Sequence, residues 1–174
     1  DKITNRVSVH STGLNIDPIV VVQKAVPGLY SDISSVEIDT YLAETAAALT
    51  VEHPDYSYLA ERLKVNSLHK ETPGFIIATK KFYDDGLLRE DYYKKVMENA
   101  DAIESVIDYD KDYTFDYFAL TTLIRAYLLK FDNKTIERPQ DLWMRVTLTV
   151  TGNEFDLDKI KETYKCLSSG VYTH

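Results

Sequence analysis

The sequence is poor in residues that cross-link or interrupt a chain. It contains one cysteine, Cys166, which excludes a disulfide within the chain and favours a reducing compartment. A lone thiol also cannot form a redox pair, so we interpret Cys166 as a small apolar side chain of a C-terminal helix. Only six glycines and five prolines occur in 174 residues, which leaves few breaks between long helical segments.

Long apolar runs and an excess of basic residues are also missing. No run approaches the ~20 residues that a membrane span requires, and the first residues lack the apolar core of a signal peptide. The net charge of −8 argues against a protein that holds duplex nucleic acid, although it permits a local basic pocket for phosphates. The chain does not begin with methionine, which predicts a fragment or a processed product.

Recognisable catalytic and metal-binding motifs are absent. The four histidines, at positions 10, 53, 69 and 174, share no metal-ligand spacing. The sequence contains no nucleophile elbow, no P-loop and no dinucleotide-binding glycine motif. The thirteen tyrosines are dispersed among apolar and turn positions, which favours core and surface aromatics over a radical pathway. No catalytic residue is therefore expected in this chain.

Helical spacing dominates the segments that remain, and it predicts a mostly α fold. Asp17-Pro18 predicts a helix start, and Ser34 with Glu37 predicts a capping box. Helices are expected over residues 2–11, 17–28, 34–49, 55–69, 75–83, 90–99, 115–131 and 156–169.

The segments between these helices give weaker signals. Residues 115–131 are apolar on most sides, which indicates a buried central helix. Residues 108–113 are expected to form a loop or short strand, and residues 132–134 a turn between short extended pieces. Residues 142–150 fit either a helix or a strand. Thr72-Pro73-Gly74 predicts a boundary between two regions, 1–72 and 73–174.

Several short stretches, taken in order, resemble one enzyme family: the large subunit of class I ribonucleotide reductases. The joint order and spacing of these stretches carry the resemblance, which spans essentially the whole chain. They are Asp1-Lys2-Ile3-Thr4, residues 35–39 and 43–47, His53-Pro54-Asp55-Tyr56 with residues 66–72, Tyr109-Asp110-Lys111-Asp112 with Phe118 and residues 127–130, Glu137-Arg138-Pro139-Gln140, Met144-Arg145-Val146, and Tyr172-Thr173-His174.

The resemblance implies a two-part layout. Residues 1–72 would be the helices of an ATP cone, whose lid, a basic glycine-containing hairpin, precedes Asp1 in the family. Residues 73–174 would be the helical region that leads into a ten-stranded catalytic barrel. The barrel carries the family's reactive thiols, so this chain alone would not catalyse.

The resemblance also implies an activity and partners for the parent protein. It would reduce ribonucleotides, usually diphosphates, to deoxyribonucleotides in the cytoplasm, with ATP and dATP as allosteric effectors. A separate small subunit would supply the radical cofactor, and a thioredoxin-type protein would supply electrons. The large subunit would form homodimers, and higher oligomers with dATP, without binding nucleic acid or membranes.

Five residues match family positions close to the effector. Asp1 and Lys2 match the end of the lid segment and the start of the first cone helix. Ser35 stands where the family often has a threonine, Asp39 matches an acidic residue that senses the ribose, and Lys70 matches a lysine that reaches the phosphates. A carboxylate can accept a ribose hydroxyl, an ammonium provides a compact charge for phosphate, and a helix N-terminus offers free N–H groups.

Simpler interpretations of these residues exist beside the functional ones. Asp39 in the first turns of a helix is favoured by the helix dipole, Ser35 is suited to capping, and Lys70 to a helix C-terminus. Two other functions also fit the sequence: a stand-alone nucleotide-sensing regulator, and a helical oligomerisation module without catalysis.

Overall fold

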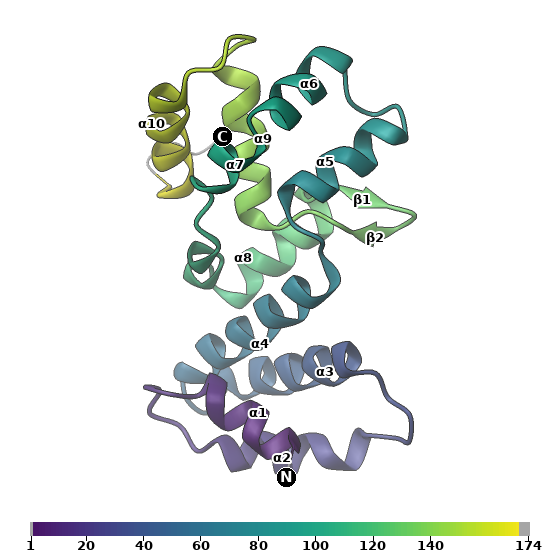
Figure 1. Cartoon of the computed structure of the whole chain (residues 1–174). Helices are drawn as coiled ribbons and strands as arrows, with labels where there is room; N and C mark the ends of the chain where they lie inside the picture. The colour runs from purple at the N-terminus through teal and green to yellow at the C-terminus, as the bar shows by residue number, and fades with distance from the viewer. Residues whose placement is uncertain (1, 171–174) are drawn as a thin grey trace. The chain divides into compact units, whose positions relative to one another are not determined.

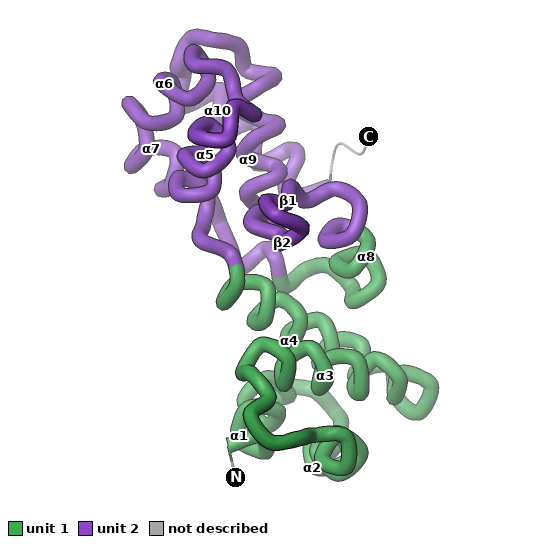
Figure 2. The backbone as a smooth tube through the Cα atoms, turned by 90° about the vertical axis from the view of Figure 1, so that its right-hand side faces the viewer, with its two compact units in different colours: residues 1–71, 113–122 green, residues 72–112, 123–174 purple. Residues whose placement is uncertain are grey.

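The computed structural model describes residues 2–170, which form ten α-helices and one two-stranded antiparallel sheet (Figure 1). The predicted mostly α fold is confirmed. The chain divides into two compact units, unit 1 made of Asp1–Glu71 with Tyr113–Thr122, and unit 2 of Thr72–Asp112 with Leu123–His174 (Figure 2). Residues 113–122 therefore belong with the N-terminal helices, whereas the boundary predicted at Thr72-Pro73-Gly74 assigned them to the second region.

The helices of unit 1 include two that begin at capping residues recognisable from the neighbouring sequence. Asp17 accepts a hydrogen bond from the Ile19 N–H at 2.9 Å, and Pro18 occupies the first turn of its helix. The Ser34 hydroxyl accepts the Glu37 N–H at 3.2 Å while Glu37 accepts the Ser34 N–H at 2.9 Å, so the predicted capping box is confirmed. The elements of this unit are α1 (Lys2–His10), α2 (Pro18–Ala25), η1 (Val26–Gly28), α3 (Ser35–Ala48), η2 (Leu49–Val51), α4 (Asp55–Glu71) and α8 (Tyr117–Thr122).

The core of unit 1 lies where α3 and α4 run side by side (Figure 1). Ala43 and Ala46 of α3 are completely buried, together with Leu59 and Leu63 of α4. Small side chains at the contact face allow two helices to approach closely. This packing fixes one face of α3 against α4 and thereby positions the polar residues at the start of α3.

Unit 2 has a second core, formed by α5, α6, α7, α9 and α10. The buried side chains include Phe75, Val96, Met144 and Ile160. Residues 142–150, which fitted either a helix or a strand, lie within helix α9. The elements of this unit are α5 (Phe75–Asp84), α6 (Glu90–Glu98), α7 (Ala100–Glu104), the first part of η3 (Tyr109–Thr114), η4 (Leu123–Tyr127), β1 (Lys130–Phe131), β2 (Lys134–Thr135), α9 (Pro139–Val150) and α10 (Leu157–Ser168).

The predicted buried helix over residues 115–131 is wrong. The segment breaks into α8, the π-helical η4 and strand β1, and both Phe118 and Tyr127 are exposed. A π-helical turn shifts the spacing away from 3.6 residues, so apolar residues that share one face of a regular helix no longer do so. Residues 109–114 form the 3-10 helix η3 instead of the loop or strand expected over 108–113.

A tight turn joins the two short strands. Lys130 pairs with Thr135 and Phe131 with Lys134, while the connecting residues Asp132 and Asn133 have φ values of 47° and 62°. Aspartate and asparagine tolerate positive φ, which the favoured two-residue hairpin turn requires. The predicted turn between extended pieces is confirmed.

The N-terminus of α9 is held by side chains of the η3 segment. The Gln140 N–H donates to Asp112 at 3.1 Å, and Asp141 accepts from the Tyr109 hydroxyl at 2.7 Å and from the Arg138 N–H at 2.9 Å. Burial raises the pKa of Asp141 to about 6, although these two hydrogen bonds lower it. Two stretches that carried the resemblance, 109–112 and 137–140, thus meet in space to satisfy a helix terminus.

We expect Tyr109→Phe to lower the free energy of unfolding by about 1–3 kcal/mol, because it leaves the buried Asp141 carboxyl without its hydroxyl donor. The Phe75 N–H, which donates to the Tyr109 hydroxyl at 3.3 Å, also loses its acceptor. Urea denaturation at pH 7 measures this change. Tyr127→Phe removes an exposed hydroxyl and is expected to change stability by less than about 0.5 kcal/mol. Equal costs for the two variants would contradict the role assigned to Tyr109.

Candidate functional site

A buried carboxylate, Asp39, lies at the centre of a polar cluster in unit 1. Its side chain is 0% exposed. One oxygen accepts from Arg6 Nη1 at 2.8 Å, and the other accepts from Asn66 Nδ2 at 3.3 Å and from the Lys70 ammonium. Both carboxylate oxygens are therefore occupied, as a buried charge requires.

Three helices supply the side chains of this cluster. Arg6 comes from α1 and Asp39 from α3, while Asn66 and Lys70 come from α4. Asn66 and Lys70 are four residues apart, so they lie on the same face of α4. Arg6 Nη1 also donates to the Ser35 carbonyl oxygen at 3.1 Å, so one guanidinium ties α1 to the first turn of α3.

The cations of the cluster lie nearer to solvent than the carboxylate does. The Arg6 side chain is 27% exposed and the Lys70 side chain 36% exposed. The pKa of His10 is lowered by burial and by the charges of Lys70, Arg62 and Arg6, while Asp39 raises it. The accessible side of the cluster is therefore cationic, and an anionic ligand that approaches it meets Lys70 and Arg6 first.

Of the residues predicted to contact the effector, the structure brings Asp39 and Lys70 into direct contact. Ser35 is exposed one turn before Asp39 and joins the cluster through its carbonyl oxygen, which accepts from Arg6. The N-cap of α3 is Ser34, so the Ser35 side chain is not used in the capping box.

The two site residues predicted at the N-terminus, Asp1 and Lys2, are not among the residues described in the polar cluster. Lys2 is exposed at the start of α1, and Asp1 lies outside the described residues. Sequence reasoning missed Arg6 and Asn66, which complete the coordination of the carboxylate. Asn66 had a local signal, because it precedes Lys70 by four residues on the same face of α4, whereas Arg6 had none beyond its polar character.

A groove borders another face of α3 in unit 1, with a volume of about 430 Å³. None of its lining residues is lysine, arginine or histidine, and three of them are glutamates. Such a surface repels phosphate, so it does not suit a nucleotide. The lining residues are Gly28, Tyr30, Ile33, Val36, Glu37, Thr40, Tyr41, Glu44 and Glu71.

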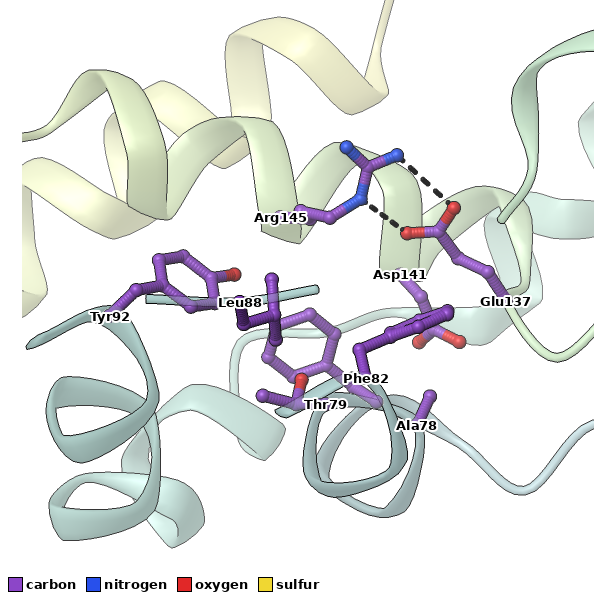
Figure 3. Close-up of a pocket in the computed structure, with 9 residues that line it drawn as sticks. Ala78, Thr79, Phe82, Leu88, Tyr92, Glu137, Asp141 and Arg145 are labelled. Atoms are coloured by element: carbon purple, nitrogen blue, oxygen red, sulfur yellow. Dashed lines mark hydrogen bonds and ion pairs between the residues drawn. The ribbon is translucent and has the colours of Figure 1, made fainter. Parts of the chain in front are cut away.

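A small void in unit 2 lies beside a buried ion pair (Figure 3). Arg145 donates to both oxygens of Glu137, at 2.7 Å and 3.2 Å, and Glu137 also accepts the Leu129 N–H at 2.9 Å. The Tyr92 hydroxyl, also buried here, has no hydrogen-bond partner among the described residues, and burial raises its pKa. The void measures about 10 Å³, room for one water at most, so this is a packed interior and not a ligand site.

We also searched the described residues for a metal site, a membrane-spanning helix and a disulfide. Residues 2–170 contain no group of three or more histidine, cysteine, aspartate or glutamate side chains placed to hold a metal ion. None of the helices in that range is long and apolar enough to cross a membrane. Cys166 is half-buried on α10 and free of any disulfide.

Comparisons with known proteins agree with the resemblance. Residues 113–174 match the family model described as "Ribonucleotide reductase, all-alpha domain". The whole chain aligns with the "Ribonucleoside-diphosphate reductase large chain" of Neurospora crassa at 38% identity, covering 20% of that protein. It aligns with the large subunits of Caenorhabditis elegans at 37% identity and Dictyostelium discoideum at 40%, covering 24% and 22% of those proteins.

The chain thus spans about a fifth to a quarter of the length of these relatives. The match extends over 100% of the chain, and the all-α description agrees with the ten helices of the described residues. The chain belongs to the ribonucleotide reductase large-subunit family and corresponds to the N-terminal region of that subunit.

Proposed function

We propose that unit 1 is the effector-sensing part of a ribonucleoside-diphosphate reductase large subunit, and that ATP and dATP bind at the Asp39 cluster. The observation that carries the proposal is the convergence of Arg6, Asp39 and Lys70 from three different helices. A buried carboxylate beside partly exposed cations matches a ligand with both a sugar hydroxyl and phosphates.

In this proposal Lys70 is the residue that binds the phosphates of the nucleotide. In the free chain its ammonium donates to Asp39, and it is the more exposed of the two cations. A polyphosphate offers several charged oxygens and competes with one carboxylate for this ammonium. Nucleotide binding therefore exchanges one ion pair, Lys70 with Asp39, for another, Lys70 with phosphate.

Asp39 then becomes available to the sugar. Once Lys70 turns to the phosphates, one carboxylate oxygen keeps its bond to Arg6 and the other can accept a ribose hydroxyl. A buried acceptor that is satisfied by a hydroxyl discriminates against a ligand without one, because the acceptor would stay unpaired. This gives the site a means to distinguish ATP from dATP.

The rest of the proposal concerns the parent protein. Residues 1–72 act as the ATP-cone helices and residues 73–174 as the helical region before the catalytic barrel, with Asp1, Lys2 and Ser35 close to the effector. The relatives are named ribonucleoside-diphosphate reductases, and the parent of this chain reduces the same class of substrate. It works in the cytoplasm as a large-subunit homodimer, and as higher oligomers with dATP, together with a radical-bearing small subunit and a thioredoxin-type reductant.

The test is a dATP titration of ribonucleotide reduction by the full-length protein with its small subunit. Asp39→Asn is expected to raise the dATP concentration needed for half inhibition by about tenfold or more. With an amide at this position no buried charge is left unpaired when the sugar hydroxyl is missing, so the dATP complex differs less from the ATP complex; an unpaired buried acceptor costs about 1–3 kcal/mol, and more when it is charged. Asp32→Asn is the matched control: Asp32 is exposed with a φ of 65°, a conformation that asparagine also adopts readily. Unchanged dATP inhibition in Asp39→Asn would reject the proposed site.

A further inference from the structure

The groove beside α3 combines an apolar floor with an acidic rim, and we call it the acidic groove. It is separate from the polar cluster around Asp39, because neither Asp39 nor Lys70 lines it. On α3, the lining residues Glu37, Tyr41 and Glu44 are two or five positions from Asp39 and therefore lie on a different face of the helix. A role for this groove therefore does not depend on nucleotide binding.

Aromatic and aliphatic side chains form the floor and walls. Tyr30 is 62% exposed, while Ile33 and Val36 are half-buried. The Tyr41 phenol lies directly against the backbone of Gly28, where an added Cβ would come within 2.1 Å of the Tyr41 hydroxyl oxygen. This contact fixes one aromatic wall of the groove, and only glycine allows it.

The carboxylates of the rim are not equivalent. Glu37 is engaged in the capping box of α3 and accepts from the Tyr30 hydroxyl at 3.3 Å. Glu44 and Glu71 are exposed, and neither forms a hydrogen bond or ion pair with another described residue. The groove therefore presents two unpaired negative charges beside the exposed ring of Tyr30 and the partly buried ring of Tyr41.

We propose that the acidic groove binds an arginine-bearing segment of a partner protein. A guanidinium pairs with carboxylates through a planar fork of donors and also stacks on aromatic faces, so Glu44, Glu71 and Tyr30 suit it together. The apolar stem of the arginine packs on Ile33 and Val36 while its charged head stays at the rim. Nucleotides and anionic lipid surfaces carry the wrong charge for this groove.

The probe is a fluorescein-labelled pentapeptide, acetylated and amidated, with the sequence glycine-arginine-leucine-arginine-glycine. Fluorescence anisotropy at low salt is expected to show saturable binding to the chain. The same peptide with citrulline in place of arginine keeps the shape and loses the charge, and it is expected to bind at least tenfold more weakly. Equal binding of the two peptides would overturn the proposal.

Variants of the chain separate the groove from general attraction to an acidic protein. The double variant Glu44→Gln with Glu71→Gln is expected to weaken peptide binding about tenfold or more. The control, Glu154→Gln with Glu162→Gln, removes two exposed carboxylates from unit 2 and is expected to leave the affinity within twofold. Equal weakening by both pairs would show that only net charge matters and would reject the groove.

A steric variant tests the groove without changing its charge. Gly28→Ala forces the Tyr41 phenol away from its wall, so it is expected to weaken peptide binding several-fold. Circular dichroism before the titration checks that helix content is unchanged. Unchanged affinity in a folded Gly28→Ala variant would contradict the assignment of Tyr41 to the binding surface.

Discussion

Replacing Asp39 with alanine is expected to lower the free energy of unfolding of unit 1 by about 2–4 kcal/mol, somewhat less than the roughly 3–5 kcal/mol typical when one partner of a fully buried ion pair is removed. Asp39 accepts hydrogen bonds from α1 through Arg6 and from α4 through Asn66 and Lys70. Its removal leaves two cations facing each other without a counter-charge. Because both cations are partly exposed, water compensates some of this loss and keeps the cost below the upper end.

A double-mutant cycle measures how much of that cost belongs to the ion pair. Lys70→Met alone breaks the contact with Asp39, whereas Lys70→Met in the Asp39→Ala background breaks nothing further. We expect the second step to cost at least about 1 kcal/mol less than the first, since contacting residues couple by about 0.5–3 kcal/mol. Urea denaturation of all four proteins gives the result, and purely additive costs would contradict a direct interaction.

The parts of this site that sequence alone could predict are those with local signals. Ser34 and Glu37 are three residues apart, and their capping box depends only on that spacing. Asp39 and Lys70 came from the family resemblance, because nothing local distinguishes Asp39 from any acidic residue near a helix start. Their contact across 31 positions depends on how α3 packs against α4, which no local pattern encodes.

Arg6 illustrates the same limit more sharply. Its side chain reaches Asp39, 33 positions away, and also the carbonyl oxygen of Ser35. In the sequence Arg6 is one polar residue on an amphipathic helix, which solvent exposure explains equally well. Only the tertiary fold, in which α1 packs against α2 and α4, brings the Arg6 side chain to Asp39 on α3.

The fold shows where apolar patterns mislead. Residues 115–131 have the composition of a buried helix, yet η4 widens the helix and Phe118 and Tyr127 face solvent. By contrast, residues 142–150 gave a mixed pattern and fold as helix α9. Asp112 and Asp141 accept hydrogen bonds from backbone N–H groups at the N-terminus of α9. Because starting a helix is the costly step, a helix whose first turn is stabilised in this way extends through a stretch with a mixed pattern.

The second large effect expected on stability concerns Glu61, and it depends on pH. Its side chain on α4 is 2% exposed, and one of its carboxyl oxygens has no hydrogen-bond partner among the described residues. Burial raises the pKa of Glu61 from 4.5 to about 8; Asp116 also raises it, while Arg62 lowers it. The folded chain therefore holds this carboxyl protonated at neutral pH, when the unfolded chain has released the proton.

The direction of the pH effect follows from that difference in bound protons. Between pH 4.5 and about pH 8 the folded state binds more protons at Glu61 than the unfolded state does, so the free energy of unfolding falls as pH rises. The stabilisation is complete below pH 4.5 and lost above pH 8. Glu61→Gln carries no titrating group, so it is expected to match the natural chain near pH 4.5 and to exceed its stability by about 2–4 kcal/mol above pH 8.

Urea denaturation of both chains at intervals between pH 4.5 and pH 9 tests this prediction. Every other titrating group contributes equally to the free energy of unfolding of both chains, so its contribution cancels in the difference between them. Glu44→Gln is the matched control, since Glu44 is exposed and lies in the same unit. Its stability difference from the natural chain is expected to stay within about 0.5 kcal/mol across the range. A difference for Glu61→Gln that stays flat with pH would mean that Glu61 ionises freely in the folded chain. In that case α4 must open to water beside α8, and the core of unit 1 would be looser than the packing around Glu61 implies.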